Sequence, residues 1–406
     1  MIDKHFDWIC CQLGAREHYA IPRVLHQNGQ LQALITDTWV DRHHLFNWLP
    51  KSYLLNLRER YHPQLETAKI KPFSYSQIAW EIIQRRKYSD WELIIKRNLW
   101  WQNRVIKILE REKENNIVLF AYSYAAAKIF KYAKNRGWKT VLGQIDPGIV
   151  ESQLVAQINH KYPQLAAGNT YPGDRYWSDW QQECSLADRI LVNSSWSAKA
   201  LQQADIEPAK IVTVPLAYER EQNSYQFVRT YPDRFTKQRP LRVLFLGQVT
   251  IRKGVAEILQ AIALLADLPI EFWFVGQVKL KLPALIVNHP QIKWLGTVSR
   301  SQTNKYYQEA DVFLFPTHSD GFGLTQLEAQ AWKLPIVASQ FCGSVVKEQI
   351  NGLILPQIAG ENIAQMLTFC LHNPQELAKY SYNSTQIISN FSLQKISQKI
   401  TNIDIN

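Results

Sequence analysis

The feature that most constrains the fold of this chain is a short apolar run that leads through a glycine, a proline or a polar turn into a helical stretch, repeated along the sequence. Short buried strands alternating with helices are typical of a parallel sheet covered on both faces. The pattern restarts near residue 241, so we predict two doubly wound, Rossmann-like α/β domains that face each other across a cleft. The expected strands are residues 8–13, 33–36, 117–122, 140–143, 188–193, 241–246, 270–275, 292–295, 312–315 and 334–338.

A polar segment at residues 216–239 separates the two halves, because it is rich in Tyr, Arg and Gln and lacks helical periodicity. It predicts an N-terminal domain of residues 1–215 and a C-terminal domain of residues 216–387. The tail from about residue 390 has apolar positions at helical spacing and is expected to form a helix. Ligands of doubly wound domains bind beyond the carboxyl ends of the strands, so we expect the functional site near the cleft.

The positive charge of the chain is concentrated in one block. The 406 residues carry a net charge of +11, and residues 42–139 alone hold 20 Lys and Arg against 8 Asp and Glu. Three interpretations of this block compete. It is a solvated, partly helical insertion, or it binds an anionic membrane surface with its Trp residues at the interface, or it binds nucleic acid with bases stacked on its aromatic rings. The aromatic residues in the block include Phe46, Trp48, Tyr53, Trp80, Trp91, Trp100 and Trp101.

The cysteines and the N-terminus bear on the compartment. The five Cys are scattered and contain no Cys-x-x-Cys, so neither a disulfide framework nor a zinc ribbon is indicated, and a reducing compartment fits best. The first residues show no basic region followed by an apolar one, and no stretch approaches the roughly 18 apolar residues of a membrane span. We therefore predict a cytoplasmic protein, with peripheral attachment to the inner face of the cell membrane left open.

Residues 315–331 carry the most informative motif, in which a strand ends, a glycine-rich loop turns and a helix begins near Gly323. The open backbone N–H groups of residues 321–324 form a ready anion site. Asp320 precedes the helix, where it can serve as a cap, and Glu328 lies farther along the helix, where its carboxylate suits ribose hydroxyls. Either acid alone fits a cap or a surface residue, but the whole string favours a nucleotide.

A second strand–loop–helix junction lies at residues 247–254. Gly247 lets the backbone turn tightly. Arg252 and Lys253 stand at a helix start, where the helix dipole does not favour basic side chains, so an anion shared with the helix would explain them. A solvated Arg-Lys pair explains them equally well.

Together these segments closely resemble the C-terminal domain of the GT-B glycosyltransferases of family four, the retaining, nucleotide-sugar-dependent group. That family has strings that read approximately Gly-Arg-x4-Lys-Gly and Glu-Gly-Phe-Gly-x4-Glu-Ala. Residues 321–323 and 328–329 match the second string outright, and Asp320 and Glu328 keep its spacing. The similarity covers roughly residues 188–357 and is weaker at residues 12–14.

The resemblance implies roles for individual residues. Lys253 should contact the donor diphosphate, Glu328 the ribose and Asp320 the transferred sugar. The catalytic residues implied are Asp320, Lys253, Arg252 and Asp146. The donor-binding residues implied are Gly14, Ala15, Gly247, Gln248, Gly276, Thr297, Val298, Ser299, Gly321, Phe322, Gly323, Leu324 and Glu328. The resemblance does not assign Arg16 and His18; their place near the first loop makes them candidates for contact with the acceptor or the sugar, and a structural role is the alternative for His18.

Three departures from the family pattern stand out. Gln248 replaces the usual Arg, so one phosphate cation is missing and Arg252 is expected to substitute for it. Asp320 is one methylene shorter than the usual Glu. Asp146 stands where the family often has a His, which would change how the primary hydroxyl of the sugar is held.

The activity that the resemblance implies is transfer of a hexose, with retention, from a UDP- or GDP-sugar to a hydroxyl of a saccharide or lipid-linked acceptor. The chain has no Asp-x-Asp and its His show no ligand spacing, so no metal and no further cofactor are expected. The alternatives are a nucleotide-sugar epimerase or phosphorylase on the same fold, or a non-catalytic basic protein that binds membrane or nucleic acid. The resemblance favours membrane over nucleic acid for residues 42–139, and implies that a C-terminal helix, residues 388–406, packs back on the N-terminal domain.

Overall fold

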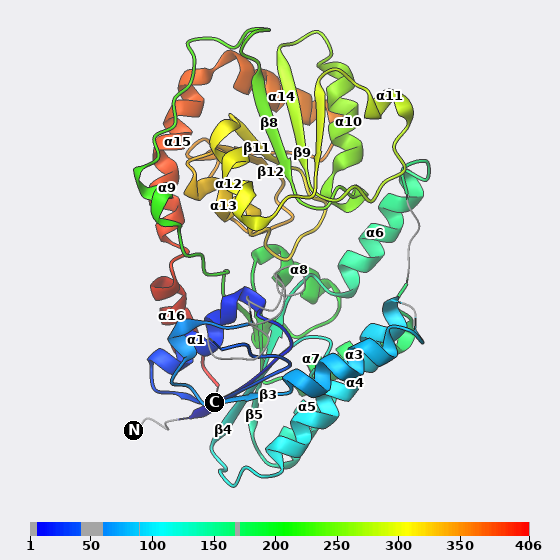
Figure 1. Cartoon of the computed structure of the whole chain (residues 1–406), viewed down its shortest axis with the longest axis vertical. Helices are drawn as coiled ribbons and strands as arrows, with labels where there is room; N and C mark the ends of the chain where they lie inside the picture. Colours follow the sequence, from blue (N-terminus) through cyan, green and yellow to red (C-terminus); the bar gives the residue numbers. More distant parts are fainter. Residues whose placement is uncertain (1–5, 42–59, 89, 167–170, 406) are drawn as a thin grey trace.

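The computed structural model describes residues 6–41, 60–88, 90–166 and 171–405, which form two α/β units, one above the other (Figure 1). The first unit contains a sheet in the order β3-β2-β1-β4-β5-β6-β7, with every pairing between its strands parallel. Its strands are β1 (Asp7–Gln12), β2 (Leu31–Thr36), β3 (Ile70–Pro72), β4 (Ile117–Tyr122), β5 (Lys139–Gln144), β6 (Arg189–Val192) and β7 (Ile211–Thr213).

The second unit repeats this arrangement with a parallel sheet in the order β10-β9-β8-β11-β12-β13. In each sheet the strand order reverses beside the first strand, between β1 and β4 and between β8 and β11. A doubly wound sheet opens a crevice at such a reversal, beyond the carboxyl ends of the strands. The predicted architecture of two doubly wound domains is confirmed. The strands are β8 (Leu241–Leu246), β9 (Ile270–Val275), β10 (Ile292–Gly296), β11 (Val312–Phe315), β12 (Ile336–Ala338) and β13 (Gly352–Ile354).

Helices cover both faces of each sheet (Figure 1). The first unit contains α1 (Ala20–Gln27), α3 (Ser74–Gln84), α4 (Asp90–Leu109), α5 (Ala127–Asn135), α6 (Ile149–Lys161), α7 (Asp174–Leu186) and α8 (Ser195–Gln203). The remaining helices are α9 (Gln222–Gln226), α10 (Val255–Leu264), α11 (Ala284–Val287), α12 (Arg300–Glu309), α13 (Thr325–Ala331), α14 (Gly360–His372), α15 (Pro374–Ser389) and α16 (Leu393–Thr401). Short 3-10 turns occur at η1 (Arg16–Tyr19), η3 (Pro63–Leu65), η4 (Pro208–Lys210) and η5 (Ile251–Lys253).

The basic block contributes to the body of the first unit. β3 is the edge strand of the sheet, and α4 buries Trp101, Val105 and Leu109 in the core, with Trp101 only 1% exposed. The interpretation of the block as a solvated insertion is therefore wrong for α4, β4 and α5, whose apolar faces supply core side chains, whereas α3 buries only Ser74 and Gln77. Residues 42–59 lie outside the described residues. Among the helices that the structure describes, none is long and apolar enough to cross a membrane.

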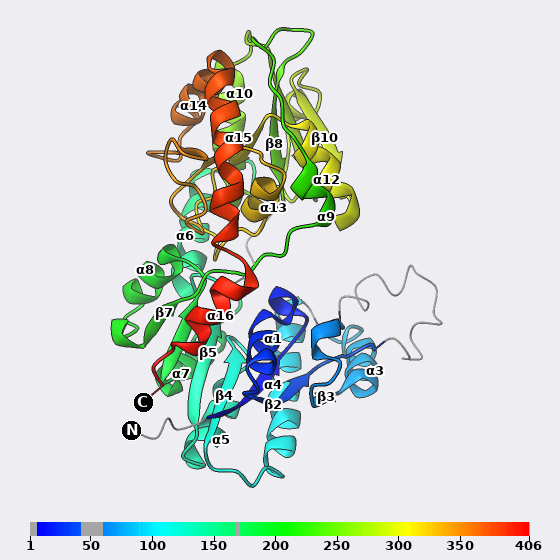
Figure 2. The ribbon, with the colours of Figure 1, turned by 90° about the vertical axis from the view of Figure 1, so that its left-hand side faces the viewer.

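The chain crosses between the two units twice. The first crossing lies between β7 and β8, and the second lies between α15 and α16 (Figure 2). The two crossings are joined where the Tyr218 N–H donates to the Phe391 carbonyl at 2.8 Å. After the second crossing, α16 packs beside α1 and buries Ile396 and Ile400 among Tyr19 and Val24.

Replacing Ile400 tests how firmly the C-terminal helix holds the N-terminal unit. The side chain is 1% exposed, so we expect Ile400→Ala to lower the free energy of unfolding by about 2 to 4 kcal/mol through lost burial and a cavity. Urea denaturation followed by tryptophan fluorescence measures this. The exposed neighbour Lys399→Ala should stay within about 0.5 kcal/mol of the wild type. Equal stability of the two variants would contradict the packing role of α16.

Candidate functional site

Glycines let three loops at the carboxyl edge of the second sheet approach one another closely. A Cβ atom on Gly276 would lie 1.9 Å from the carbonyl oxygen of Gly247, and one on Gly254 would lie 2.0 Å from the carbonyl oxygen of Pro316. Gly254 also has a φ of +75°, which side-chain-bearing residues rarely adopt. The loop after β8 and the loop after β11 are therefore held in direct contact.

This contact places Lys253 and Asp320 in an ion pair. The Lys253 ammonium also lies 4.9 Å from the centre of the Phe315 ring. Burial alone would raise the pKa of Asp320, but the neighbouring Lys253 and Arg252 charges hold it below its ordinary value. Asp320 does not cap α13, which begins at Thr325 without a side-chain cap; instead it accepts from the Phe322 N–H at 3.4 Å. An incoming anion must therefore compete with Asp320 for the Lys253 ammonium.

Arg252 belongs to a network that joins the two units. Its guanidinium lies 3.4 Å from the Glu151 carboxylate at the start of α6, and it donates to the Ser319 carbonyl. The Ser319 hydroxyl donates to Glu151 at 2.7 Å, and the Trp196 indole N–H of α8 donates to that hydroxyl at 3.0 Å. Burial raises the pKa of Glu151 to about 7, although Arg252 opposes this rise.

The glycine-rich loop makes a second contact across the cleft. The Ser197 hydroxyl donates to the Gly321 carbonyl at 3.2 Å, and a Cβ on Gly321 would lie 2.4 Å from the Ile145 carbonyl oxygen. Asp146 comes next along the chain, so it lies against the loop that holds Asp320. Its Oδ1 accepts from the Tyr124 hydroxyl at 2.5 Å and from the Gly148 N–H at 2.9 Å. Of the predicted catalytic residues, the structure brings Lys253, Arg252, Asp320 and the Asp146 loop together.

Glu328 lies in the first turn of α13 and is half-buried. The hydroxyl of Tyr307 donates to its Oε2 at 2.7 Å, and burial together with this carboxylate raises the pKa of Tyr307. One oxygen of Glu328 is therefore fixed, which orients the other. By contrast, Thr297 is exposed, and Ser299 caps α12 with a capping box. Thr297, Val298 and Ser299 line neither of the two cavities described next.

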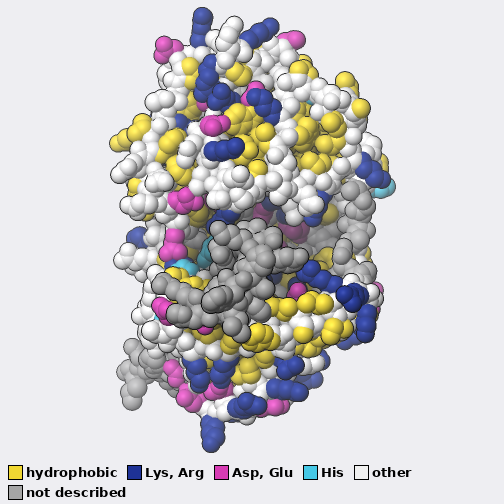
Figure 3. Space-filling model, in the orientation of Figure 1, with side chains coloured by type: hydrophobic (Ala, Val, Ile, Leu, Met, Phe, Trp, Pro, Cys, Tyr) yellow, Lys and Arg dark blue, Asp and Glu magenta, His cyan; other side chains and the backbone are white. Residues whose placement is uncertain are grey.

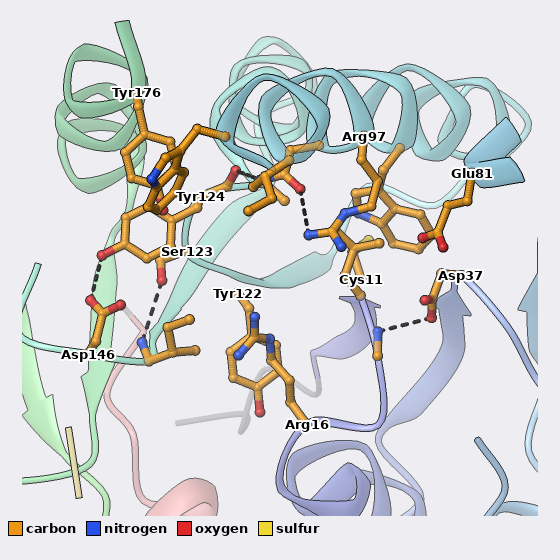
Figure 4. Close-up of a pocket in the computed structure, with 18 of the residues that line it drawn as sticks. Cys11, Arg16, Asp37, Glu81, Arg97, Tyr122, Ser123, Tyr124, Asp146 and Tyr176 are labelled. Atoms are coloured by element: carbon orange, nitrogen blue, oxygen red, sulfur yellow. Dashed lines mark hydrogen bonds between the residues drawn. The ribbon is translucent and has the colours of Figure 1, made fainter. Parts of the chain in front are cut away.

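A cavity of about 430 Å³ lies at the carboxyl ends of β1 and β4 (Figure 4). Three of the predicted residues, Gly14, Arg16 and Asp146, line it. The loop after β1 is held by the buried side-chain amide of Gln12, which donates to the carbonyls of Gly14 and Arg16 at 2.9 and 3.0 Å. The other lining side chains that carry charge or aromatic rings are Asp37, Arg60, Glu81, Trp91, Arg97, Trp101, Tyr122, Tyr124 and Tyr176.

A second cavity, of about 400 Å³, lies between the units. Gln248 and Arg252 line it from the second unit, and Glu151 lines it from the first. The two cavities share Trp91, Tyr124, Asp146 and Tyr176, so they lie side by side. We call them the N-terminal cavity and the interdomain cavity.

Two of the remaining predicted residues, His18 and Ala15, line neither cavity and contact other residues of the chain. His18 lines neither cavity and lies 2.8 Å from the guanidinium of Arg300 in the second unit. It stands in a run of three left-handed residues, with φ of 52° at Glu17, 49° at His18 and 58° at Tyr19. Such backbone costs of the order of 1 to 3 kcal/mol per residue and clusters at functional loops. Ala15 packs against the core beside β1.

The sequence patterns missed several side chains that build the site. The sequence could have identified Asp37 and Tyr124 as site residues, because each follows the carboxyl end of a predicted strand. It could not have identified Glu151, Ser319 and Trp196, because their connection exists only across the interface between the units. Within the described residues, no group of three or more His, Cys, Asp or Glu could hold a metal ion.

Comparison with known proteins gives a family for part of the chain. Residues 230–387 match the family model described as glycosyl transferases group 1. A D-inositol 3-phosphate glycosyltransferase of Corynebacterium urealyticum is 29% identical over 168 residues, which cover 35% of this chain and 40% of that protein. The matches span less than half the length of the curated relatives.

Solved structures match nearly the whole chain. HepE of Anabaena in complex with UDP and glucose has a TM-score of 0.60 at 14% identity and covers 98% of both chains. The sucrose-phosphate synthase of Thermosynechococcus elongatus has a TM-score of 0.65 at 13% identity, with 98% of this chain and 97% of that chain covered. At such identities the likeness shows the fold, which is GT-B. The family match and this fold confirm the resemblance drawn from the motifs.

The raised pKa of Glu151 predicts how stability depends on pH. The folded chain keeps a proton on Glu151 up to about pH 7, whereas the carboxyl of the unfolded chain loses its proton near its ordinary pKa of 4.5. The wild type should therefore lose stability as the pH rises from 5 to 8. Glu151→Gln has no such proton to release on unfolding, so its free energy of unfolding should fall by about 2 kcal/mol less over the same pH range.

Urea denaturation of both proteins at pH 5, 6, 7 and 8 measures the effect. The exposed neighbour on α6, Gln153→Ala, is the matched control and should follow the wild type. Parallel pH curves for the wild type and Glu151→Gln would show that Glu151 is not held in the protonated form.

Proposed function

We propose that this chain, whose fold is GT-B and whose residues 230–387 match the group 1 glycosyl transferases, is a retaining, metal-independent glycosyltransferase. It moves a hexose from a nucleotide diphosphate sugar, a UDP- or GDP-sugar, to a hydroxyl of a saccharide or lipid-linked acceptor. The observation that carries the proposal is the group of Lys253, Arg252 and Asp320 at the carboxyl edge of the second sheet, facing Asp146 across the cleft.

The donor is held by the second unit. Lys253 and Arg252 neutralise the charge of the diphosphate, since fixed cations act most strongly where water is excluded. The N–H groups of Gly323 and Leu324 donate to no acceptor among the described residues and are available to phosphate or sugar oxygens. Glu328, oriented by Tyr307, accepts the ribose hydroxyls. The UDP bound in the HepE structure makes UDP-sugars the first donors to test.

The transfer step needs no dedicated protein base. The bond between the sugar C1 and the leaving phosphate oxygen breaks, the acceptor oxygen bonds C1 from the same face, and its proton passes to the leaving diphosphate. Asp320, kept ionised by the two cations, lies beside the transferred sugar, and Asp146 holds a sugar hydroxyl. Closure of the two units excludes water and so limits hydrolysis of the donor.

A surface on α3 supports a further partner, an anionic membrane at the cytoplasmic face. Tyr75, Ile82 and Ile83 are 60%, 57% and 54% exposed and lie on one side of α3, which ends at the basic residues 85–87. Figure 3 shows hydrophobic side chains beside Lys and Arg over this region. Apolar side chains flanked by cations are typical of helices that lie in the interface of anionic lipids.

Donor binding is the first test of the proposal. We expect UDP or GDP to raise the melting temperature of the wild type, because a ligand of the folded state stabilises it. Lys253→Ala and Glu328→Ala should each weaken binding about 10- to 100-fold, the size expected for a lost charged hydrogen bond. Lys379→Ala, exposed on α15, should bind like the wild type. The absence of stabilisation by any nucleoside diphosphate would refute the proposal.

Product analysis separates the related activities. A glycosyltransferase releases nucleoside diphosphate when an acceptor is added, and nuclear magnetic resonance of the product reports retention of the anomeric configuration. An epimerase would convert the donor without an acceptor, and a phosphorylase would require inorganic phosphate.

Flotation with vesicles tests the membrane surface. The wild type should float with vesicles that contain phosphatidylglycerol and stay unbound with purely neutral phosphatidylcholine, because cations are attracted to anionic lipid. Ile82→Asp/Ile83→Asp should reduce flotation at least about fivefold, since two charges would enter the apolar stripe. Leu285→Asp, exposed on α11 of the other unit, is the control and should float like the wild type. Equal recovery with neutral vesicles would contradict this surface.

A further inference from the structure

Three arginines and three carboxylates line the N-terminal cavity (Figure 4), and two of the arginines make no ion pair with a carboxylate of the described residues. Its carboxylates already have partners. Asp37 accepts from Arg60 and from the Gly14 N–H, each at 2.9 Å. Glu81 accepts from Gln77 at 3.0 Å, and Asp146 accepts from Tyr124 and Gly148. Arg60 is thereby paired, and two further arginines remain.

Arg97 is the first of these two. It projects from α4 toward the cavity in Figure 4, and its only hydrogen bond within the described residues is a long one of 3.4 Å to the adjacent Asn98 amide oxygen. Its Nε is fully buried and donates to no described acceptor. Arg97 as a whole is half-buried, but a buried donor atom without an acceptor is costly unless a partner arrives, so the cavity suits an acceptor of hydrogen bonds that carries negative charge.

Arg16 is the second. It lies in the loop after β1 and interacts electrostatically with the adjacent Glu17, but its guanidinium makes no salt bridge with a carboxylate of the described residues; it lies 5.7 Å from the centre of the Tyr122 ring. Arg16 and Arg97 line the N-terminal cavity but not the interdomain cavity, where Arg252 lies. Their charge is therefore separate from the cations that we assign to the donor diphosphate.

Aromatic rings form the opposite wall of the cavity. Tyr124 and Tyr176 stack with their centres 4.8 Å apart, and Trp91 meets the edge of Tyr176 at 5.3 Å. Such ring faces are apolar and suit the C–H face of a sugar or a similar ring. Tyr124, Tyr176 and Asp146 also line the interdomain cavity, so a ring held here would present a hydroxyl toward the donor.

We propose that the N-terminal cavity binds an acceptor that carries an anionic group, a phosphate or a carboxylate, next to the ring that is glycosylated. Arg97 and Arg16 bind the anion, and the Tyr124–Tyr176 wall packs against the ring. The inference rests on the proposed glycosyltransferase activity and names the class of its acceptor. A neutral acceptor would leave Arg97 without an ion-pair partner among the described residues.

The test uses the full chain saturated with UDP, so that added phosphates cannot occupy the donor site. Isothermal titration with glucose 6-phosphate, glucuronate and glucose compares two anions with a neutral ring. A second arm compares farnesyl phosphate with farnesol in neutral detergent micelles and identifies a lipid as the source of the phosphate. We expect at least one anionic compound to bind about 10- to 100-fold tighter than its neutral analogue, as charge-assisted hydrogen bonds imply.

Variants assign the preference to the two arginines. Arg97→Gln should remove most of it, Arg16→Gln part of it, and Arg97→Lys should keep part of it, since Lys restores the charge but not the fork of donors. Arg104→Gln on the same helix, whose guanidinium stacks on Trp100 outside the cavity, is the matched control and should behave like the wild type. All four variants should bind UDP with the wild-type affinity.

The outcomes are distinct. Equal binding of anionic and neutral compounds, or an unchanged preference in Arg97→Gln that still binds UDP, overturns the assignment of the acceptor class. A failure of the wild type to bind UDP instead counts against the proposed function, and the same titrations without UDP then still report whether the cavity prefers anions. If Arg97→Gln fails to bind UDP, Arg97→Lys takes its place in the test, and a preference for anions that is undiminished in Arg97→Lys overturns the assignment.

Discussion

The close approach of Gly321 to the Ile145 carbonyl sets the distance between the two units, and the rest of the site depends on it. No side chain separates the backbones at this point. Asp146 therefore lies against the loop that carries Asp320, and α6 comes near enough for Glu151 to reach Arg252 and Ser319. A bulkier contact would leave two separate half-sites, each with its charges exposed to water, where electrostatic interactions are weaker.

The strands that the sequence predicted best are those buried on both faces. Residues 117–122, 241–246, 270–275 and 312–315 agree with the observed bounds because a central parallel strand reads as one continuous apolar run. β3, β7 and β13 have three residues each and were missed, whereas β12 is equally short but lies within the longer apolar run of residues 334–338. At the site, the motifs identified Lys253, Asp320 and Glu328, since these residues follow strands in a fixed order along the chain. Arg97 and Glu151 escaped because they lie in the middle of α4 and at the start of α6, and only the packing of those helices brings them to the cavities.

The basic block shows how a single charge count can combine three physical roles. Its helix α4 buries Trp101 in the core, α3 exposes an apolar stripe beside cations, and Arg60 and Arg97 point their charges into a cavity. A count over residues 42–139 cannot separate these roles, because burial and pairing are properties of the folded chain. The expectation of an anionic partner in this half of the protein now has specific side chains to carry it.

The paired crossings between the units have a mechanical consequence. A single connecting segment would leave the relative orientation of the two units unrestricted. Here two connecting segments run side by side and are joined by the hydrogen bond from the Tyr218 N–H to the Phe391 carbonyl. Two adjacent connections define an axis, so they favour a hinge rotation of one unit relative to the other about that axis. Opening then sweeps the far side of the cleft through the largest arc, which admits a bulky substrate there while residues near the axis keep their neighbours.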